Sequence, residues 1–236
     1  MTDTQLSFKR YEQKYLVPAD KFEPLWERLG PRLVPDRFFE SCVLSLYYDD
    51  ESFSMIRSSI EKPVYKEKLR LRSYGVPGAD SEVFVELKKK YKGLVQKRRV
   101  LLNEREATDW LAGGAAPGDT QIVREIDWVL RKQPLRPAVL IACDRRAYVA
   151  REDEALRVTV DSSVRWRDTE LSLSAGAHGE ELLHDGEKLV ELKLPQSTPL
   201  WLAELLSECR VFPTGFSKYG SCYTNKLISK YFTVTE

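Results

Sequence analysis

The sequence of 236 residues has few of the residues that build the commonest metal and redox sites. It contains only two histidines, His178 and His184, and four cysteines that form no C-x-x-C pair. A histidine-rich metal site is therefore nearly excluded, and both histidines fall in a polar stretch where we expect surface positions. Widely spaced cysteines without a paired motif are typical of reduced, structural cysteines in a cytosolic protein.

Long apolar runs are also missing. The N-terminal stretch MTDTQLSFKRYEQ has no apolar core of the kind found in signal peptides. No segment approaches the roughly 20 apolar residues of a membrane-spanning helix. We therefore expect a cytoplasmic protein.

The sequence has no strong excess of one charge. Its 37 basic and 36 acidic residues give a net charge of +1, so it lacks the global positive field of a typical nucleic-acid-binding protein. We expect no nucleic-acid partner, and any anion site must come from local sorting of charge. The chain shows no internal repeat or low-complexity linker, which favours a single domain over residues 1–236.

Local sorting of charge is clearest in the segment Lys66-Glu-Lys-Leu-Arg-Leu-Arg72. In a strand, side chains alternate between the two faces, so Lys66, Lys68, Arg70 and Arg72 would share one face. Such a row of cations either is fully solvated or meets an anionic ligand. The next predicted strand, 81–91, repeats the pattern, with Glu86 and Lys88 opposite to a face of valine and leucine.

Hydrophobic periodicity and turn residues predict an α+β fold. We expect strands at 7–17, 43–48, 64–74, 81–91, 94–103, 137–150, 156–167, 170–174 and 188–194. We expect helices at 18–29, about 49–60, 104–111, 120–132, 198–209 and 217–231. The mostly meandering strands indicate a large antiparallel sheet flanked by helices, and about eight strands can close into a barrel with room inside for side chains or one ligand.

Several predicted strands carry charged residues at alternate positions on one face. These are Arg10/Glu12/Lys14, Lys66/Lys68/Arg70/Arg72, Glu86/Lys88, Arg145, Arg157/Thr159/Asp161 and Glu191/Lys193. For one strand, the simpler interpretation is the solvent face of a half-exposed sheet. The repetition favours a second interpretation, in which the sheet closes and these faces line a cationic tunnel.

A cationic tunnel suits polyphosphate chemistry. Phosphoryl transfer depends mainly on cations placed against the phosphate oxygens and on a divalent metal that offsets developing charge. Glu12, Glu86 and Glu191 could supply hard oxygen ligands for Mn²⁺ or Mg²⁺. The alternative for each is a same-face salt bridge with the lysine two residues later, which would contribute little free energy.

The order of these motifs resembles the VTC (vacuolar transporter chaperone) polyphosphate polymerase domain, a triphosphate tunnel metalloenzyme. The resemblance covers nearly the whole chain. The motifs that carry it are Phe8-Lys-Arg-Tyr-Glu-Gln-Lys-Tyr15, Leu46-Tyr-Tyr-Asp49, Lys68-Leu-Arg-Leu-Arg-Ser-Tyr-Gly75, Glu86-Leu-Lys88, Arg145-Arg-Ala-Tyr148, Leu156-Arg-Val-Thr-Val-Asp161, Leu189-Val-Glu-Leu-Lys193 and Phe216-Ser-Lys-Tyr219.

The resemblance implies an ATP-dependent polymerase that transfers the γ-phosphate of ATP to a growing polyphosphate chain. The residues that it implies as catalytic are Arg70, Arg72, Lys88, Arg145 and Arg157. Further phosphate-binding candidates are Lys14, Lys68, Arg98, Lys193 and Lys218, although the strand register leaves open whether Lys97 or Arg98 faces the tunnel. Glu191 would hold the Mn²⁺ or Mg²⁺ ion, with Glu12 and Glu86 as additional candidates.

The sequence also departs from the tunnel enzymes. Tunnel hydrolases tend to begin with Glu-x-Glu-x-Lys, whereas this chain has Arg10-Tyr-Glu-Gln-Lys14. Losing a carboxylate weakens the alternative of a triphosphate or nucleoside triphosphate hydrolase; a non-enzymatic module that binds polyphosphate or inositol polyphosphate is a further alternative. The phosphate-sensing domain and membrane helices of the fungal proteins are not in this sequence, so we expect any membrane-protein partner to act in trans, at the inner face of the membrane.

Overall fold

The structure is a computed structural model, which describes residues 11–61, 63–92, 94–194 and 197–232. Its strands are β1 (Tyr11–Val17), β2 (Leu33–Asp49), β3 (Tyr65–Tyr74), β4 (Glu82–Tyr91), β5 (Leu94–Asn103), β6 (Arg136–Ala150), β7 (Arg157–Arg167), β8 (Glu180–Glu181) and β9 (Lys188–Leu194). Its α-helices are α1 (Ala19–Leu29), α2 (Ser54–Ile60), α3 (Glu104–Leu111), α4 (Gln121–Lys132), α5 (Leu200–Glu208), α6 (Lys218–Cys222) and α7 (Ile228–Phe232). A 3₁₀ segment, Gly30–Arg32, follows α1, and a π-helical segment, Tyr223–Leu227, joins α6 to α7.

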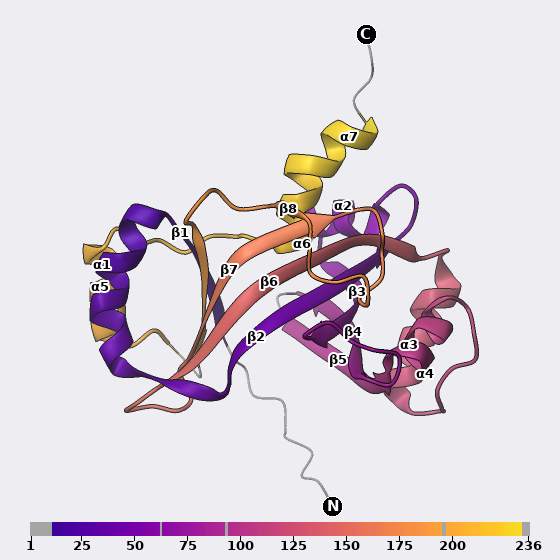
Figure 1. Ribbon diagram of the computed structural model, residues 1–236, viewed down its shortest axis with the longest axis horizontal. Helices are drawn as coiled ribbons and strands as arrows, with labels where there is room; N and C mark the ends of the chain where they lie inside the picture. Colours follow the sequence, from indigo (N-terminus) through magenta and orange to yellow (C-terminus); the bar gives the residue numbers. More distant parts are fainter. Residues whose placement is uncertain (1–10, 62, 93, 195–196, 233–236) are drawn as a thin grey trace, which may run out of the picture. The chain divides into compact units, whose positions relative to one another are not determined.

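The strands form one sheet in the order β1-β9-β7-β6-β2-β3-β4-β5, with β8 paired to β7 (Figure 1). The predicted α+β class and the antiparallel sheet flanked by helices are confirmed. Among the described residues the order ends at β1 and β5, and closure of the sheet into a barrel remains a prediction.

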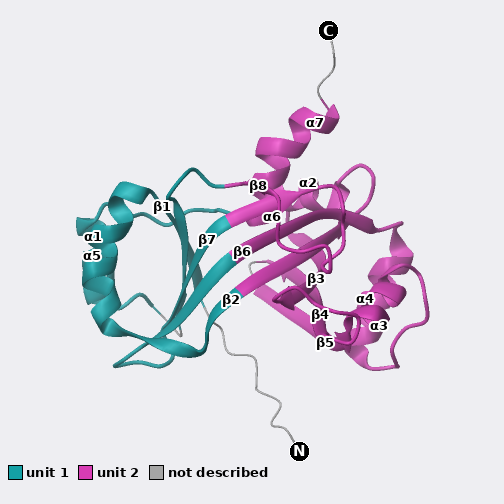
Figure 2. Cartoon of the chain, viewed as in Figure 1, with its two compact units in different colours: residues 1–41, 144–163, 183–216 teal, residues 42–143, 164–182, 217–236 magenta. Residues whose placement is uncertain are grey.

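The chain forms two compact units, each assembled from three separate segments (Figure 2). Unit 1 comprises residues 1–41, 144–163 and 183–216, and unit 2 comprises residues 42–143, 164–182 and 217–236. Strands β2, β6 and β7 contribute residues to both units. Because the units interleave along the chain, they are not consecutive domains, and the single domain over residues 1–236 stays a prediction.

In unit 2, helices α3 and α4 cover the apolar face of β3, β4 and β5. Leu69, Leu87, Trp110 and Ile126 belong to one buried cluster. Both helices begin at polar caps, since the Asn103 side chain accepts a hydrogen bond from the Glu106 amide and the Thr120 side chain from the Val123 amide. The opposite face of these strands is left for the charged residues.

In unit 1 too, helices cover one face of the sheet and leave the other face to polar residues. Helices α1 and α5 contribute Leu25, Leu29 and Leu202 to a buried cluster with Val158 of β7 and Leu192 of β9. The residues that alternate with the valines and leucines therefore lie on the other face of the sheet. No helix among the described residues of the chain has the length and apolar composition needed to cross a membrane.

Two predicted strands were wrong in extent or place. The strand predicted at 43–48 is the end of β2, which begins at Leu33 and has 17 residues; Pro35 and weak alternation hid its first half. The strand predicted at 170–174 does not form. Instead the buried Arg167 guanidinium donates hydrogen bonds to the carbonyls of Glu170, Ser172, Gly176 and His178, so that the segment wraps around this side chain.

Candidate functional site

The row of cations predicted on β3 is confirmed. Leu69 and Leu71 are 0% and 1% exposed and pack in the core of unit 2, whereas Lys68, Arg70 and Arg72 alternate with them and are half-buried. The apolar face of the strand is fixed by the helices behind it. Because side chains alternate along a strand, the cations lie on the other face, which is the polar face of unit 2.

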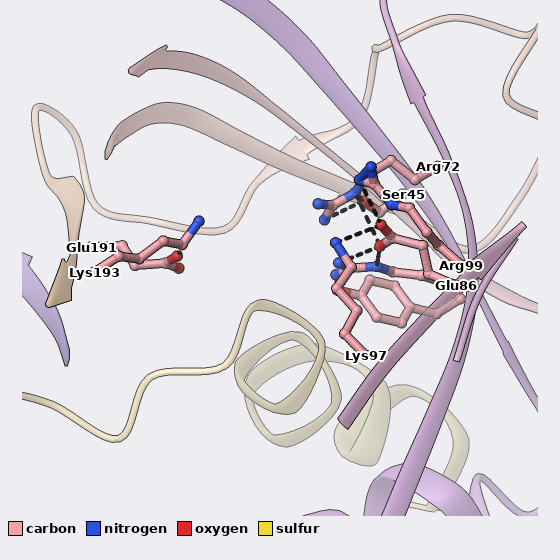
Figure 3. Close-up of polar contacts among 9 residues, drawn as sticks. Ser45, Arg72, Glu86, Lys97, Arg99, Glu191 and Lys193 are labelled. Carbon is pink, nitrogen blue, oxygen red and sulfur yellow. Dashed lines mark hydrogen bonds and ion pairs between the residues drawn. The ribbon is translucent and has the colours of Figure 1, made fainter. Parts of the chain in front are cut away.

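The row is organised by one buried carboxylate. Glu86 of β4 is 1% exposed, and four cationic side chains approach its oxygens (Figure 3). The nitrogen–oxygen distances are 2.6 Å to Arg70, 3.9 Å to Arg72, 2.6 Å to Lys97 and 3.5 Å to Arg99. We call these five residues the Glu86 cluster; with four cations around one carboxylate, it carries an excess of positive charge.

The excess of positive charge lowers the pKa of Glu86. Burial alone would raise its pKa, but Arg70, Arg72 and Lys97 outweigh burial and lower the pKa to about 2. The carboxylate therefore stays ionised at any ordinary pH. It acts as a counter-ion that keeps the cations together.

Two arginines of the cluster have defined orientations. The Arg70 guanidinium donates from Nε to Glu86 at 2.8 Å and from Nη1 to the Tyr47 hydroxyl at 3.1 Å. Arg72 donates from Nε and Nη2 to the Ser45 hydroxyl, both at 3.1 Å. Fixed guanidinium groups are preorganised to bind phosphate oxygens, because less side-chain entropy is lost on binding.

Other predicted lysines lie near the cluster in unit 2. Strand pairing places Lys88 of β4 directly opposite Lys68 of β3 and Lys97 of β5. Lys68 donates a hydrogen bond to the Ser217 hydroxyl at 3.0 Å, and Ser217 caps α6, which begins at Lys218. The start of α6 therefore lies against the face of β3, although the two are far apart in the sequence.

The strand register corrects one predicted residue. In the β4–β5 pairing, Lys97 lies opposite Lys88 and Arg98 opposite Leu87. Arg98 is therefore on the helix-covered face, where its Nε lies 3.4 Å from Glu125 of α4. Lys97 and its alternate neighbour Arg99 take the places on the polar face, and Arg98 is removed from the phosphate-binding candidates.

Unit 1 holds a second group of predicted residues, in which two rows of side chains cross β1, β9 and β7. One row is Lys14, Glu191 and Thr159, and the next is Glu12, Lys193 and Arg157.

Glu191 is the buried carboxylate of this second group. Its oxygens lie 3.3 Å from Lys193, a contact drawn in Figure 3. They also lie 3.9 Å from Lys14. Burial would raise the pKa of Glu191, but Lys193, Lys14, a hydrogen bond with Glu12 and Arg145 lower it well below the ordinary value.

The two remaining predicted arginines of unit 1 have acidic partners. Arg145 of β6 donates two hydrogen bonds, of 2.6 and 2.7 Å, to Asp161, which is fully buried on β7. Bidentate pairing of this kind fixes the guanidinium plane. Arg157 is 48% exposed and lies 3.8 Å from Asp36, so it is held less firmly.

The glutamates differ in how well they fit a divalent metal. Glu86 does not fit, because four cations already surround its oxygens. Glu191 and Glu12 fit better, since their carboxyl groups meet and together offer hard oxygen ligands. Across the described part of the chain, no group of three or more His, Cys, Asp or Glu side chains is placed to hold a metal, so phosphate oxygens or water would have to complete the coordination.

Several residues of these groups were not predicted from the sequence. Asp161 lies within a recognised charge pattern, but nothing in the pattern shows that it holds Arg145. Ser45 and Tyr47 were missed because neither side chain is charged, and Arg99 because the register of β5 was open. Arg10 was assigned to the first strand, and it lies outside the described residues.

Residues 9–225 match the model of the VTC domain family. The chain belongs to this family. It is 25% identical over an alignment of 250 residues to vacuolar transporter chaperone complex subunit 4 of Trypanosoma cruzi, covering 86% of this chain and 30% of that protein. The corresponding subunit of Trypanosoma brucei brucei is 24% identical over 246 residues, with the same coverage. The VTC domain chain thus spans about a third of the length of these curated relatives.

Solved structures show the same fold at low sequence identity. A candidate adenylate cyclase from Bacillus halodurans superposes with a TM-score of 0.55 at 15% identity, covering 94% of this chain and 96% of that chain. A candidate adenylyl cyclase from Hippeastrum with a dominant triphosphatase activity has a TM-score of 0.53 at 16% identity, covering 91% and 95%. These two solved structures support the fold described above.

Proposed function

We propose that this VTC domain is an ATP-dependent polyphosphate polymerase, which transfers the γ-phosphate of ATP to the end of an inorganic polyphosphate chain. The observation that carries the proposal is the Glu86 cluster, in which four cations share one buried carboxylate. A folded protein gains little from such a charge excess unless a polyanion binds there. ATP and polyphosphate are polyanions of the required kind.

The reaction requires no covalent bond between the protein and a substrate. The terminal oxygen of the polyphosphate chain is itself the nucleophile, and ADP is the leaving group. What remains for the protein is to align the two phosphates and stabilise the charge that develops between them. Arg70 and Arg72, held by Glu86, Tyr47 and Ser45, are suited to this role because they present fixed donors to phosphate oxygens.

The residues of unit 1 supply the candidate metal ligands. Glu191 and Glu12 would hold a Mn²⁺ or Mg²⁺ ion, which offsets negative charge on the phosphate oxygens when bound. Lys14 and Lys193 flank Glu191 and can bind phosphate oxygens. Arg145, fixed by Asp161, offers the same kind of contact from β6.

Hydrolysis of a triphosphate is the second candidate, because Glu12 and Glu191 bring two carboxyl groups together and a similar structure has triphosphatase activity. Position 10 argues for the polymerase, since it has Arg10 where tunnel hydrolases tend to have a third carboxylate. Fewer carboxylates and more cations favour retention of a long anion over its release.

Purified protein incubated with ATP and Mn²⁺ tests the proposal. Polyphosphate on a stained gel, together with ADP, supports polymerisation. Phosphate and ADP without chains would instead support the hydrolase, and no turnover with protection against melting by polyphosphate would support a binding module.

A matched pair of variants connects the activity to the cluster. Arg70→Ala should lower the rate at least about 100-fold, the usual loss on removal of a charge-stabilising donor. Arg98→Ala removes the same side chain from the helix-covered face and should leave the rate within twofold. Equal rates for the two variants would contradict the assignment.

The cellular setting is part of the proposal. The curated relatives are named as subunits of a complex and are about three times longer than this chain. Because these relatives are subunits of a vacuolar transporter chaperone complex, we infer that the VTC domain works in the cytoplasm together with a membrane protein. Co-purification of the chain with a membrane protein from its native cells would test this placement.

A further inference from the structure

Tyr47 is a buried residue of the polar face that lies directly against the Glu86 cluster. It is 7% exposed, and strand pairing places it opposite Arg70, which is opposite Glu86 on the next strand. The three side chains therefore form one row across β2, β3 and β4. In this row a neutral phenol and a carboxylate flank the same guanidinium.

The ring of Tyr47 is held in place by its neighbours. It stacks on the ring of Tyr219 of α6, with centroids 4.7 Å apart and an interplanar angle of 27°. The Tyr219 hydroxyl donates a hydrogen bond of 2.9 Å to Asp49, whose carboxylate also accepts from the Met55 and Ile56 amides at the start of α2. The position of the Tyr47 hydroxyl is thus determined by a chain of packed and hydrogen-bonded groups.

Contacts on both sides leave part of the Arg70 guanidinium available. An arginine has five N–H donors. Arg70 uses Nε and Nη2 toward Glu86 and one Nη1 hydrogen toward Tyr47. Two donors, one on each Nη atom, remain after these contacts with the described residues.

We propose that Tyr47 is a substrate-positioning residue, which holds the Arg70 guanidinium on the side away from Glu86 so that its two remaining N–H groups can bind a phosphate oxygen. This inference rests on the proposed function, because it assigns a role within the same phosphate site. Tyr47 acts through Arg70 and does not itself touch the reacting atoms. Without its hydroxyl, Arg70 would keep its charge and its bond to Glu86 but could turn about that bond.

The charge around Tyr47 gives this role a distinctive pH dependence. The charged and titratable groups that face it are Lys68, Arg70 and Arg72 of β3, Glu86 of β4, Lys97 of β5, Tyr219 of α6 and Asp49 of β2. Burial would raise the pKa of Tyr47, but Arg70, Arg72 and Lys68 outweigh it and lower the pKa to about 8. Above that pH a tyrosinate would cancel one positive charge of the site and compete with the incoming phosphate for Arg70.

Calorimetric binding of inorganic tripolyphosphate, without turnover, tests the inference. At pH 7 the Kd of Tyr47→Phe should be about tenfold higher than that of the wild type, the size expected for one lost hydrogen bond to a charged group. As the pH rises to 9, the wild type loses affinity through tyrosinate formation, so the tenfold difference in Kd between Tyr47→Phe and the wild type should narrow. Lys97, whose pKa burial lowers to about 8, contributes equally to both proteins and cancels in the comparison.

Tyr48→Phe is the matched control, because Tyr48 is the next residue, is buried and lies in the apolar core of unit 2. Its Kd should equal that of the wild type at both pH values. The positioning role is overturned if Tyr47→Phe binds tripolyphosphate as tightly as the wild type. It is also overturned if the ratio of the two Kd values stays constant from pH 7 to pH 9. A constant ratio would mean that Tyr47 only supports the fold locally.

Arg70→Ala separates this inference from the proposed function. If Arg70→Ala binds tripolyphosphate as well as the wild type, the phosphate site itself is wrong, and the role of Tyr47 is lost with it. If Arg70→Ala loses binding and Tyr47→Phe does not, only the role of Tyr47 fails. Should Tyr47→Phe not fold, ultraviolet titration of the wild type replaces it: tripolyphosphate should shift the first tyrosine ionisation to higher pH, and an unchanged ionisation would refute the inference.

Discussion

Replacing Glu86 with glutamine should destabilise the protein far more than replacing the partly exposed acid Glu125. The Glu86 carboxylate is 1% exposed and lies within 3.9 Å of Arg70, Arg72, Lys97 and Arg99. Glutamine keeps the size of the side chain but removes the negative charge, so the four cations would be left facing one another. Removing one partner of a buried ion pair typically costs about 3–5 kcal/mol.

The pKa of Glu86 gives an independent magnitude. Its decrease from 4.5 to about 2 in the folded protein corresponds to about 3 kcal/mol in favour of the ionised, folded state at neutral pH. Because the carboxylate is almost fully buried, little of this is screened by solvent. The cations are partly exposed and can regain water, so we expect a loss of about 2–3 kcal/mol for Glu86→Gln.

Urea denaturation at pH 7 measures the loss. The matched control is Glu125→Gln, which removes an acid paired with Lys89 at 3.0 Å and Arg98 at 3.4 Å on the helix-covered face. The side chains of Glu125 and its two partners are partly exposed. Losing these ion pairs should therefore lower the free energy of unfolding by no more than about 1 kcal/mol. A Glu86→Gln variant as stable as Glu125→Gln would refute the view that Glu86 holds the cluster together.

The sign of the pH dependence follows from the lowered pKa. A carboxylate with a folded-state pKa below its unfolded value stabilises the fold above about pH 4.5, and this contribution disappears as the pH falls toward 2. The difference in stability between the wild type and Glu86→Gln should therefore shrink over that range. A difference that persists at pH 2 would have to come from packing and not from charge.

Two further substitutions test the separation of faces and the metal site. Lys97→Ala should raise the Kd for tripolyphosphate about tenfold in calorimetry, whereas Arg98→Ala should leave it within twofold, because only Lys97 lies on the polar face. Glu191→Gln should weaken Mn²⁺ binding at least about tenfold, as measured by electron paramagnetic resonance. Glu12→Gln should weaken it less, since Glu12 is exposed. Equal Mn²⁺ affinity for Glu191→Gln and the wild type would exclude this metal site.

The fold was predictable where the periodicity was strict. Strands β3 and β4 place leucine or valine at alternate positions between charged residues in their central parts, so the position of each strand and its apolar face follow from the sequence. The start of β2 breaks this alternation with Pro35 and adjacent phenylalanines, and only the tertiary structure supplies its pairing. The loop around Arg167 depends on carbonyls of residues up to 11 positions away, a distance at which local patterns carry no information.

The site was predictable in its residue types but not in its partners. Alternation showed that Arg70 and Arg72 share a face, yet it could not show that Ser45 and Tyr47 of β2 lie across from them. Neutral side chains give no charge signal, so they become visible only when the register of two strands is known. The same uncertainty placed Arg98 in the site instead of Lys97, because a shift of one residue exchanges the two faces of a strand.

A carboxylate on a cationic face can be a counter-ion or a metal ligand, and the number of cations around it decides between the two. The sequence treats Glu86 and Glu191 alike, since each has a lysine two residues later. In the folded protein, four cations lie within 3.9 Å of the Glu86 oxygens. Two lysines flank Glu191, where a second carboxyl group from Glu12 joins it. Positive charge that is already in excess repels a divalent cation and attracts phosphate, so the Glu86 cluster favours the anion, and Glu191 together with Glu12 favours the metal.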